Sequence, residues 1–315
     1  MQDDSPPAPE GLNGDVHDAA TAPVSRKEKP MMIDARQALP LQTAAPGVAL
    51  FPAEFERVLA RLRTDIDDLA AAEDLTVLTA PPVLPRDIVE RSGYVREFPH
   101  LLGSVHNFGG DATEWLARRA EAVSGGDWHD RQEIADVVLT PAACYHIYPL
   151  LAGATLTAPA RFAVEACCYR HEATVEPGRF RSFRMRELVF VGTADACVEF
   201  RDRWRQRVAD WLTTLGLDVA TETATDPFFG PGAKLLSVNQ RAQALKFELV
   251  APVADGLRQA VASANCHKDH FGEIFGIELP DGSPAHSACV AFGLERIALA
   301  VAYAERDGAP TSESR

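Results

Sequence analysis

The 315-residue sequence lacks an export signal and lacks a hydrophobic run long enough to cross a membrane. A bilayer span needs about 20 consecutive apolar residues, and the polar start MQDDSPPAPE has no signal-peptide core. The six cysteines show no CxxC spacing. We therefore expect reduced thiols in a cytoplasmic protein rather than a disulfide framework. P-loop, GxGxxG and HExxH patterns are also missing, which removes the common phosphate-binding and zinc-protease motifs.

Basic residues are few relative to acidic ones. The chain has 31 Lys and Arg against 45 Asp and Glu, a net charge of −14. This balance argues against a broad nucleic-acid surface and leaves room for a local basic groove. The hydrophobic share of 46% and the charged share of 24% are those of an ordinary soluble protein with a sizeable core.

The chain is predicted to hold one folded domain between two flexible ends. Residues 1–46 contain seven prolines and no periodic pattern, which predicts a disordered tail. We expect the folded domain at 47–305 and a flexible C-terminus at 306–315. Apolar residues at helical spacing predict helices over the following ranges: 51–69, 112–123 and 195–214. Strand patterns occupy 136–140 and 244–252, and the chain closes on a strand or turn leading into a helix at 286–305. The mixed order predicts an α+β domain on a mainly antiparallel sheet.

Residues 165–192, EACCYRHEATVEPGRFRSFRMRELVFVG, form two strand-like runs around a loop rich in Arg, Pro and Gly. Strand alternation places Arg170 and Glu172 on one face. It places Glu187 in a row that is otherwise apolar, where an unpaired carboxylate is costly or has a shifted pKa. A salt bridge to a neighbouring Arg would explain Glu187, and so would a metal or substrate ligand. The arginines suit phosphate binding, although basic hairpins are also common solvated edges.

Several separated motifs together resemble one family. CYRHE followed by RFRSFRMRE resembles motif 2 of the class II aminoacyl-tRNA synthetases, and AFGLERIAL resembles their motif 3. Within the seryl-type branch, PPVLPRDIVERSGYVREFPHLLGSVHNF, TPAACYHIYP and ANCHKDHFGEIFGI look like the truncated homologues called amino acid:[carrier protein] ligases. The resemblance covers about residues 75–303. It implies the class II synthetase catalytic fold, a mainly antiparallel sheet flanked by helices.

The resemblance implies a nucleotide site on the hairpin. Arg170 matches the arginine that holds the ATP α-phosphate, and Glu172 matches the residue that accepts a hydrogen bond from the adenine amino group. Phe183 matches the ring stacked on adenine, and Arg179 is expected to reach the β- and γ-phosphates. Arg296, which in isolation reads as a surface residue at a helix start, is expected to clamp the γ-phosphate or cover adenine. Further nucleotide contacts are expected from Ala262, Ser263 and Asn265. Arg170 and Arg296 are the expected catalytic residues.

The resemblance also implies one zinc ion per subunit, bound by Cys144, Glu187 and Cys289. Three protein ligands leave a fourth position open, which would take water and then the amino group of the amino acid, so Glu187 also belongs to the amino-acid site. Cys266, His267 and His270 suggest a second metal cluster, but we favour contacts to the nucleotide from this segment. The remaining cysteines are interpreted as packing residues: Cys167, Cys168 and Cys197.

The Mg²⁺ that accompanies ATP has no clear ligand in the sequence. RQAVASAN (258–265) lines up with a family segment whose acidic Mg²⁺ ligand falls on Gln259 here. Either another carboxylate holds the ion, with Glu248 as the candidate, or the phosphates and water carry it.

These features predict ATP-dependent activation of a small amino acid, glycine or alanine before serine, and its transfer to the phosphopantetheine thiol of a holo acyl carrier protein. A seryl-type tRNA synthetase is the alternative, disfavoured because a large tRNA-binding arm is not seen and the charge is acidic. An inactive paralogue that binds an amino acid or nucleotide and acts as a regulator is a third possibility. The resemblance implies a homodimer, and from the charge and the hydropathy we expect neither tRNA nor a membrane as a partner. An acidic carrier would need a basic contact, and the 195–214 helix offers four arginines that could equally be solvated: Arg201, Arg203, Arg205 and Arg207.

Overall fold

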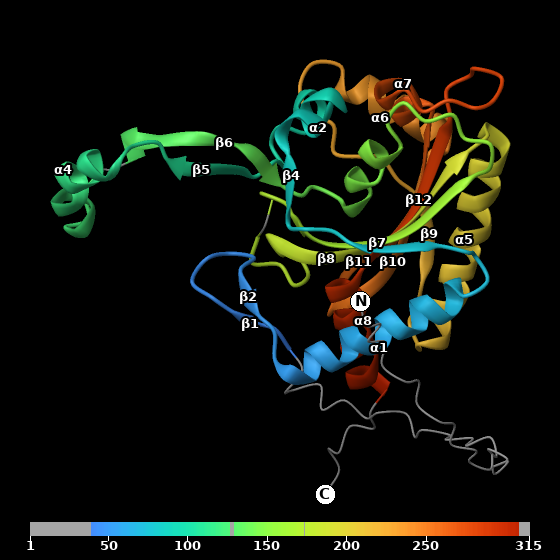
Figure 1. Cartoon of the computed structure of the whole chain (residues 1–315). Coiled ribbons are helices and arrows are strands. Elements are labelled where there is room, and N and C mark those ends of the chain that lie inside the picture. Colours follow the sequence, from blue (N-terminus) through green and yellow to red (C-terminus); the bar gives the residue numbers. More distant parts are fainter. Residues whose placement is uncertain (1–38, 127–128, 173, 309–315) are drawn as a thin grey trace, which may run out of the picture. The chain divides into compact units, whose positions relative to one another are not determined.

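The computed structural model describes residues 39–126, 129–172 and 174–308 (Figure 1). Residues 1–38 of the expected tail and residues 309–315 of the expected flexible C-terminus lie outside this part. Within the expected tail, β1 (Leu41–Gln42) pairs with β2 (Ala49–Leu50), so paired backbone begins before residue 47. None of the described helices is both long and apolar enough to span a bilayer.

A seven-stranded sheet forms the centre of the described chain. Its strands, in spatial order, are β3 (Thr76–Thr79), β7 (Ala160–Tyr169), β8 (Ser182–Gly192), β12 (His286–Gly293), β11 (Leu257–Lys268), β10 (Lys246–Ala254) and β9 (Ala220–Thr223). Only the edge pair β3–β7 is parallel, and the other neighbours are antiparallel. The predicted α+β fold with a mainly antiparallel sheet is confirmed.

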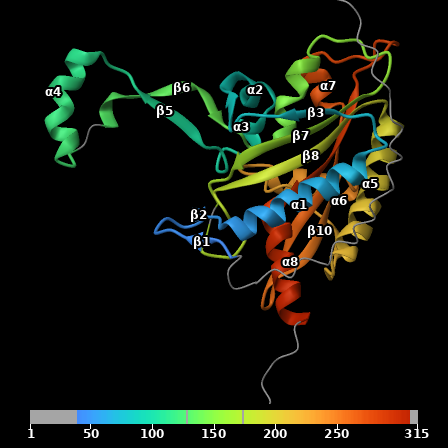
Figure 2. The ribbon, with the colours of Figure 1, turned by 60° about the horizontal axis from the view of Figure 1, so that its bottom comes forward.

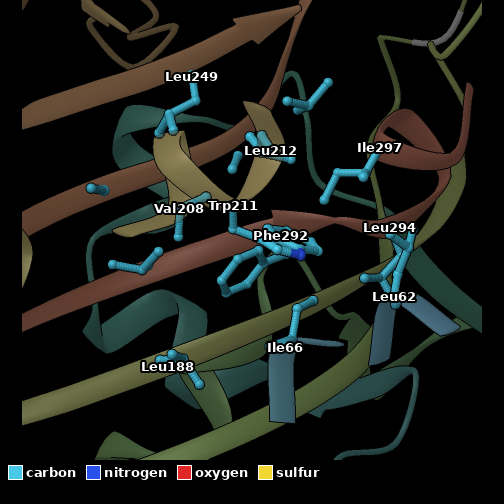
Figure 3. Close-up of a cluster of buried hydrophobic side chains, with 14 of the residues drawn as sticks. Leu62, Ile66, Leu188, Val208, Trp211, Leu212, Leu249, Phe292, Leu294 and Ile297 are labelled. Atoms are coloured by element: carbon cyan, nitrogen blue, oxygen red, sulfur yellow. The ribbon is translucent and has the colours of Figure 1, made fainter. Parts of the chain in front are cut away.

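The helices on one face of this sheet are long and amphipathic. They are α1 (Ala53–Ala70), α5 (Ala194–Thr214) and α8 (Leu294–Gly308). α5 and α8 contact the central strands, and α1 contacts α8. Figure 3 shows Leu62 and Ile66 from α1 beside Trp211 and Leu212 from α5, with Phe292 of β12 among them. Burial of these side chains supplies most of the stabilisation of this layer. The bounds of these helices match the sequence predictions closely.

The other face of the sheet carries short elements and the second core. These are η2 (Ala143–His146), η3 (Tyr148–Leu151), α2 (Arg86–Arg91), α3 (Tyr94–Glu97) and α7 (His270–Phe275). Strand alternation divides β8 between the two cores: Leu188 and Phe190 face the helix layer, whereas Val189 and Val191 face the second core. Glu187 has the same parity as Val189, so its side chain is directed to the face with the short elements.

The remaining elements are less buried. β4 (Val83–Pro85), β6 (Gln132–Leu139) and β5 (Ser104–Phe108) form a three-stranded sheet, with α4 (Ala112–Val123) and η1 (His129–Arg131) between β5 and β6. In both views β5, β6 and α4 extend away from the seven-stranded sheet (Figures 1 and 2). α6 (Ala233–Ala242) precedes β10. Neither α4 nor α6 contains a buried residue.

An ion-pair network joins α1 and α8 to β8. The Arg184 guanidinium donates to Glu295 at 2.6 Å and to Glu56 at 2.6 Å, and Glu295 is 1% exposed. We expect Arg184→Met to lower the free energy of unfolding by about 3–5 kcal/mol, because the buried Glu295 carboxylate loses its cationic partner and keeps the backbone N–H of residue 184. Urea unfolding measures this loss.

The loss should depend on pH. Burial raises the pKa of the Glu295 carboxyl above its ordinary value, although Arg184 opposes this. Without Arg184 the pKa of the Glu295 carboxyl rises further. A carboxyl whose pKa is higher in the folded than in the unfolded protein makes the fold less stable as the pH rises through that folded-state pKa. The deficit should therefore be largest near neutral pH and shrink in mild acid. Arg57→Met, which removes an exposed pair with Glu54, is the control and should cost under about 1 kcal/mol at either pH. A deficit that grows in acid would contradict this account.

Candidate active site

Three side chains from distant segments converge on the face that carries the short elements. Cys144 lies on η2, Glu187 on β8 and Cys289 on β12, and their ligand atoms lie within 4.8 Å of one another. β8 and β12 are neighbours, with Ala291 opposite Glu187 and Cys289 opposite Val189. Glu187 therefore lies two residues along β8 from Val189, the partner of Cys289, and the two side chains lie on the same face of neighbouring strands.

The third ligand is delivered by the end of β6. The Thr140 N–H donates to the Pro82 carbonyl at 2.9 Å, and Pro141 then stops the strand because it has no N–H to donate. The small residues Ala142 and Ala143 let the backbone turn into η2 close to the sheet. The Cys144 N–H donates to Glu187 Oε1 at 3.0 Å, so the carboxylate is oriented by backbone.

The three ligands are buried and protonate readily when no cation is present. Burial raises the pKa of the Glu187 carboxyl, despite a hydrogen bond from the Cys144 backbone. A hydrogen bond with Cys289, followed by burial, raises the pKa of Cys144 well above that of a free thiol. Cys289 receives a hydrogen bond from Cys144 that lowers its pKa, but burial and Glu187 leave it raised. Three acids that share a buried space are stabilised as anions by a divalent cation, and two thiolates with one carboxylate suit zinc.

The salt-bridge explanation of Glu187 is not supported by the ion pairs of the described residues. Arg184 pairs with Glu56 and Glu295, and Arg186 pairs with Asp67 and Glu165. Both arginines have the opposite strand parity to Glu187 and are directed to the helix side. The metal-ligand explanation is the one that the geometry favours.

A cleft of about 610 Å³ opens beside the three ligands. Its walls include every site residue expected from the sequence: Cys144, Arg170, Glu172, Arg179, Phe183, Glu187, Ala262, Ser263, Asn265, Cys289 and Arg296. Gln259, Glu248, Cys266 and His267 also line it. The cleft thus contains two thiols and a carboxylate that converge as metal ligands would, and it also contains arginines that suit phosphate oxygens.

Arg170 is held in the cleft by a residue that the sequence reasoning did not assign. Its Nη1 donates to Tyr94 Oη at 2.8 Å, and its backbone N–H donates to the Arg181 carbonyl at 2.9 Å. Tyr94 is 3% exposed, and burial raises its pKa while Arg170 opposes the rise. The phenol therefore stays neutral and fixes one edge of the guanidinium. Tyr94 lies in GYVREFPH, which carried the family resemblance, but no charge or spacing marked it.

The hairpin loop is fastened over β11 by Arg296 at the start of α8. Arg296 Nε donates to the Gly178 carbonyl at 2.9 Å, and Nη1 donates to the Ala260 carbonyl at 3.1 Å. Gly178 has a φ of +77°, and a Cβ there would lie 2.3 Å from Gln259 Oε1. The positive φ favours glycine here, whereas the close approach involves only the movable end of the Gln259 side chain.

Arg179, in the same hairpin loop, is bound by acidic residues of that hairpin. Arg179 Nε donates to Glu176 at 3.0 Å, and Glu172 lies 3.8 Å from Arg179 Nη1. Gln259 Nε2 donates to the other oxygen of Glu176 at 3.2 Å, while Gln259 Oε1 is buried without a hydrogen-bond partner among the described residues. A polyphosphate that reached Arg179 would have to replace the Glu176 carboxylate as its partner.

Glu248, the candidate Mg²⁺ ligand, lies on β10 opposite Ser263. Its Oε1 is 3.2 Å from Lys246 Nζ, which also pairs with Asp226 at 2.6 Å. Burial alone would raise the pKa of Asp226, but Lys246 holds it below its ordinary value. Glu248 is therefore already partly neutralised, which weakens its pull on a cation.

Two other groups of residues singled out in the sequence have specific partners in the structure. His270 Nε2 bonds the Ser92 carbonyl at 3.0 Å, and Cys266, His267 and His270 do not form a metal cluster within the described residues. The α5 arginines are occupied: Arg203 and Arg207 pair with Glu73, Arg205 lies over the Phe247 ring, and Arg201 is 7% exposed. Arg203 and Arg207 share the single Glu73 carboxylate and keep side-chain exposures of 51% and 39%, so a basic contact for a carrier on α5 stays a prediction.

The chain is similar to known proteins both in sequence and in fold. No family model matches the chain. It is 41% identical over 263 residues to "Amino acid--[acyl-carrier-protein] ligase 2" of Bradyrhizobium diazoefficiens, covering 82% of this chain and 78% of the relative. It is 31% identical over 170 residues to the type-2 serine–tRNA ligase of Methanothermobacter thermautotrophicus, covering 50% of this chain and 33% of that protein. The solved M. kandleri SerRS, in complex with A. aeolicus tRNASec, superposes with a TM-score of 0.72 at 17% identity, over 85% of this chain and 56% of the synthetase.

Proposed function

Because this chain belongs to the amino acid–[acyl-carrier-protein] ligase family, we propose that it activates glycine or alanine with ATP and transfers it to the phosphopantetheine thiol of a holo acyl carrier protein. One observation carries the proposal. A buried Cys–Glu–Cys group and an arginine-lined pocket share a single cleft, so an amino acid held by its amine would present its carboxylate to a bound nucleotide.

The residues at one end of the cleft fit a zinc ion. Cys144, Glu187 and Cys289 would hold it, and the bound ion would supply a coordination position for the amino group of the substrate. The chain's own contribution is orientation. Cys144 and Glu187 are linked through the backbone N–H at 3.0 Å, so the ligand atoms are fixed before the substrate arrives. A neutral amine fixed there leaves the amino-acid carboxylate free to react.

The first half-reaction joins the carboxylate to the nucleotide. A carboxylate oxygen attacks the α-phosphorus of ATP, the bond from that phosphorus to the oxygen bridging to the β-phosphate breaks, and pyrophosphate leaves with the electron pair. Arg170 would stabilise the charge that develops on the α-phosphate, and Arg179 and Arg296 would hold the β- and γ-phosphates. The adenine would stack on Phe183 and donate to Glu172.

The remaining contacts position the nucleotide and its Mg²⁺. Ala262, Ser263 and Asn265 lie along β11, which forms the floor of the cleft, and we assign them to the ribose and phosphates. Because Glu248 is paired with Lys246 and Gln259 is uncharged, we propose that the phosphates and water supply most of the Mg²⁺ ligands.

In the second half-reaction the thiol sulfur of phosphopantetheine attacks the carbonyl carbon of the aminoacyl-adenylate. The bond from that carbon to the phosphate oxygen breaks, AMP leaves with the electron pair, and the thiol proton passes to solvent. No side-chain nucleophile is required, because proximity and charge stabilisation account for the chemistry.

The acceptor is tested directly. Labelled glycine or alanine, ATP and the zinc-loaded protein are incubated with holo-carrier protein, with the apo-carrier that lacks phosphopantetheine, or with tRNA. We expect label only on the holo-carrier, and hydroxylamine should release it as expected of a thioester. Label on tRNA with an unlabelled carrier would establish the seryl-type alternative. Failure of ATP–pyrophosphate exchange with every amino acid tested would leave a binding protein.

A further inference from the structure

His267 lies beside a metal ligand without being one of the three converging ligands. It occupies the end of β11, and its Nε2 is 3.7 Å from Cys289 Sγ. Its Nδ1 is 3.1 Å from Ser287 Oγ and 3.2 Å from Tyr148 Oη. Ser287 is 1% exposed and Tyr148 is fully buried. The imidazole thus links two buried hydroxyls on one side to a sulfur on the other.

The hydrogen bonds select one tautomer. A thiolate accepts but cannot donate, so Nε2 must carry the proton that faces Cys289. Nδ1 is then an acceptor, and a hydroxyl of Tyr148 or Ser287 donates to it. The ring is further fixed by Phe271, whose centroid lies 5.1 Å away in an edge-to-face contact.

Cys289 receives a second donor, which separates it from Cys144. Asn265 Nδ2 donates to Cys289 Sγ at 3.4 Å and to Ser263 at 3.2 Å. Two N–H groups are therefore directed at one sulfur, whereas Glu187 accepts from the Cys144 backbone. A sulfur with two N–H donors is prepared to carry negative charge, since each bond to the charged form stabilises it.

We propose that His267 is a positioning residue for Cys289: its Nε2–H group fixes the direction of the thiolate and reduces its electron donation to the bound metal, with Tyr148 and Ser287 holding the required tautomer. The proposal rests on the metal site of the proposed function. Outer partners of this kind orient ligands and tune a metal, and their loss typically costs about 10- to 100-fold in metal affinity. The sequence analysis favoured nucleotide contacts for the segment that holds His267, and local spacing could not show its partner Cys289, which is 22 residues away on the next strand.

Two substitutions separate the hydrogen bond from the volume of the side chain. His267→Leu removes the N–H group, whereas in His267→Gln the side-chain amide N–H can reach the same sulfur. Each full-length protein is reconstituted with zinc for chelator competition and with cobalt for the sulfur-to-cobalt charge-transfer band. We expect His267→Leu to bind zinc about 10- to 100-fold more weakly and to shift the band. His267→Gln should stay within about threefold of the unsubstituted protein, with its band unchanged.

Tyr148→Phe provides a variant that keeps the imidazole in place. It removes one hydroxyl from Nδ1, and we expect a smaller shift of the band in the direction of His267→Leu. Thermal unfolding establishes that each variant is folded. If His267→Leu and His267→Gln weaken zinc equally, or if neither weakens it, His267 has no positioning role. If the unsubstituted protein itself binds neither zinc nor cobalt, the proposed metal site fails instead, so the two failures are distinguishable.

Discussion

Arg170→Ala is expected to lower amino-acid-dependent ATP–pyrophosphate exchange about 1,000-fold, which corresponds to about 4 kcal/mol of activation free energy. The guanidinium is fixed in the cleft by Tyr94 and by the end of β7, so it needs no reorganisation when charge develops on the α-phosphate. Arg170→Lys keeps a charge but loses the planar fork. We expect it to recover only part of the rate.

Tyr94→Phe is the matched control, because it removes the 2.8 Å contact to Arg170 and keeps the ring in the core. We expect a loss of about tenfold, mainly in kcat, since the hydrogen bond that orients the guanidinium disappears while its charge remains. Circular dichroism and thermal unfolding should show that both proteins remain folded. Exchange by Arg170→Ala within tenfold of the unsubstituted rate would remove Arg170 from the α-phosphate role.

The long helices were predictable because one face of each is apolar and the other is not. The hairpin strands were predictable from two runs of strand-forming residues around a loop with Pro and Gly, although both faces of β8 are covered. β11 was not among the predicted strands, although apolar and polar residues alternate from Ala262 to His267 and the apolar ones are the more buried. Most of its residues are small or polar rather than the β-branched and aromatic types enriched in strands, so the pattern is weak. α6 was also missed. None of its residues is buried, so packing left little pattern in its sequence.

In the site, too, some features follow from local sequence pattern and others do not. Strand parity alone predicted that Glu187 lies among apolar residues, and its 1% exposure bears this out. Its convergence with Cys144 and Cys289 depends on which strands are neighbours, and no local spacing encodes that. The family resemblance supplied it. Arg203 and Arg207 illustrate the converse, because their common partner Glu73 lies 130 and 134 residues away and local charge patterning cannot reveal such a pair.

Cys289→Ala is expected to abolish both the metal content and the activation reaction. Removal of one thiolate leaves two ligands, which is too few for a stable zinc site, so zinc per chain should fall from about one to near zero. Exchange should fall by more than about 1,000-fold, because the amine is no longer fixed and the advantage of a positioned carboxylate is lost. Elemental analysis and the exchange assay measure the two effects on the same preparation.

Cys197→Ala is the matched control. Cys197 is also a buried thiol, but it lies on α5 in the helix-side core, so its removal should cost some stability and leave the zinc content unchanged. ATP binding should distinguish loss of metal from loss of fold, since the arginine-lined part of the cleft is built from β7, the hairpin loop and α8. We therefore expect Cys289→Ala to bind ATP within about threefold of the unsubstituted protein, because a missing thiolate removes no phosphate partner. Equal zinc in the Cys289→Ala and Cys197→Ala proteins would show that the three converging side chains are not ligands, and the assignment of the amine site would fall with them.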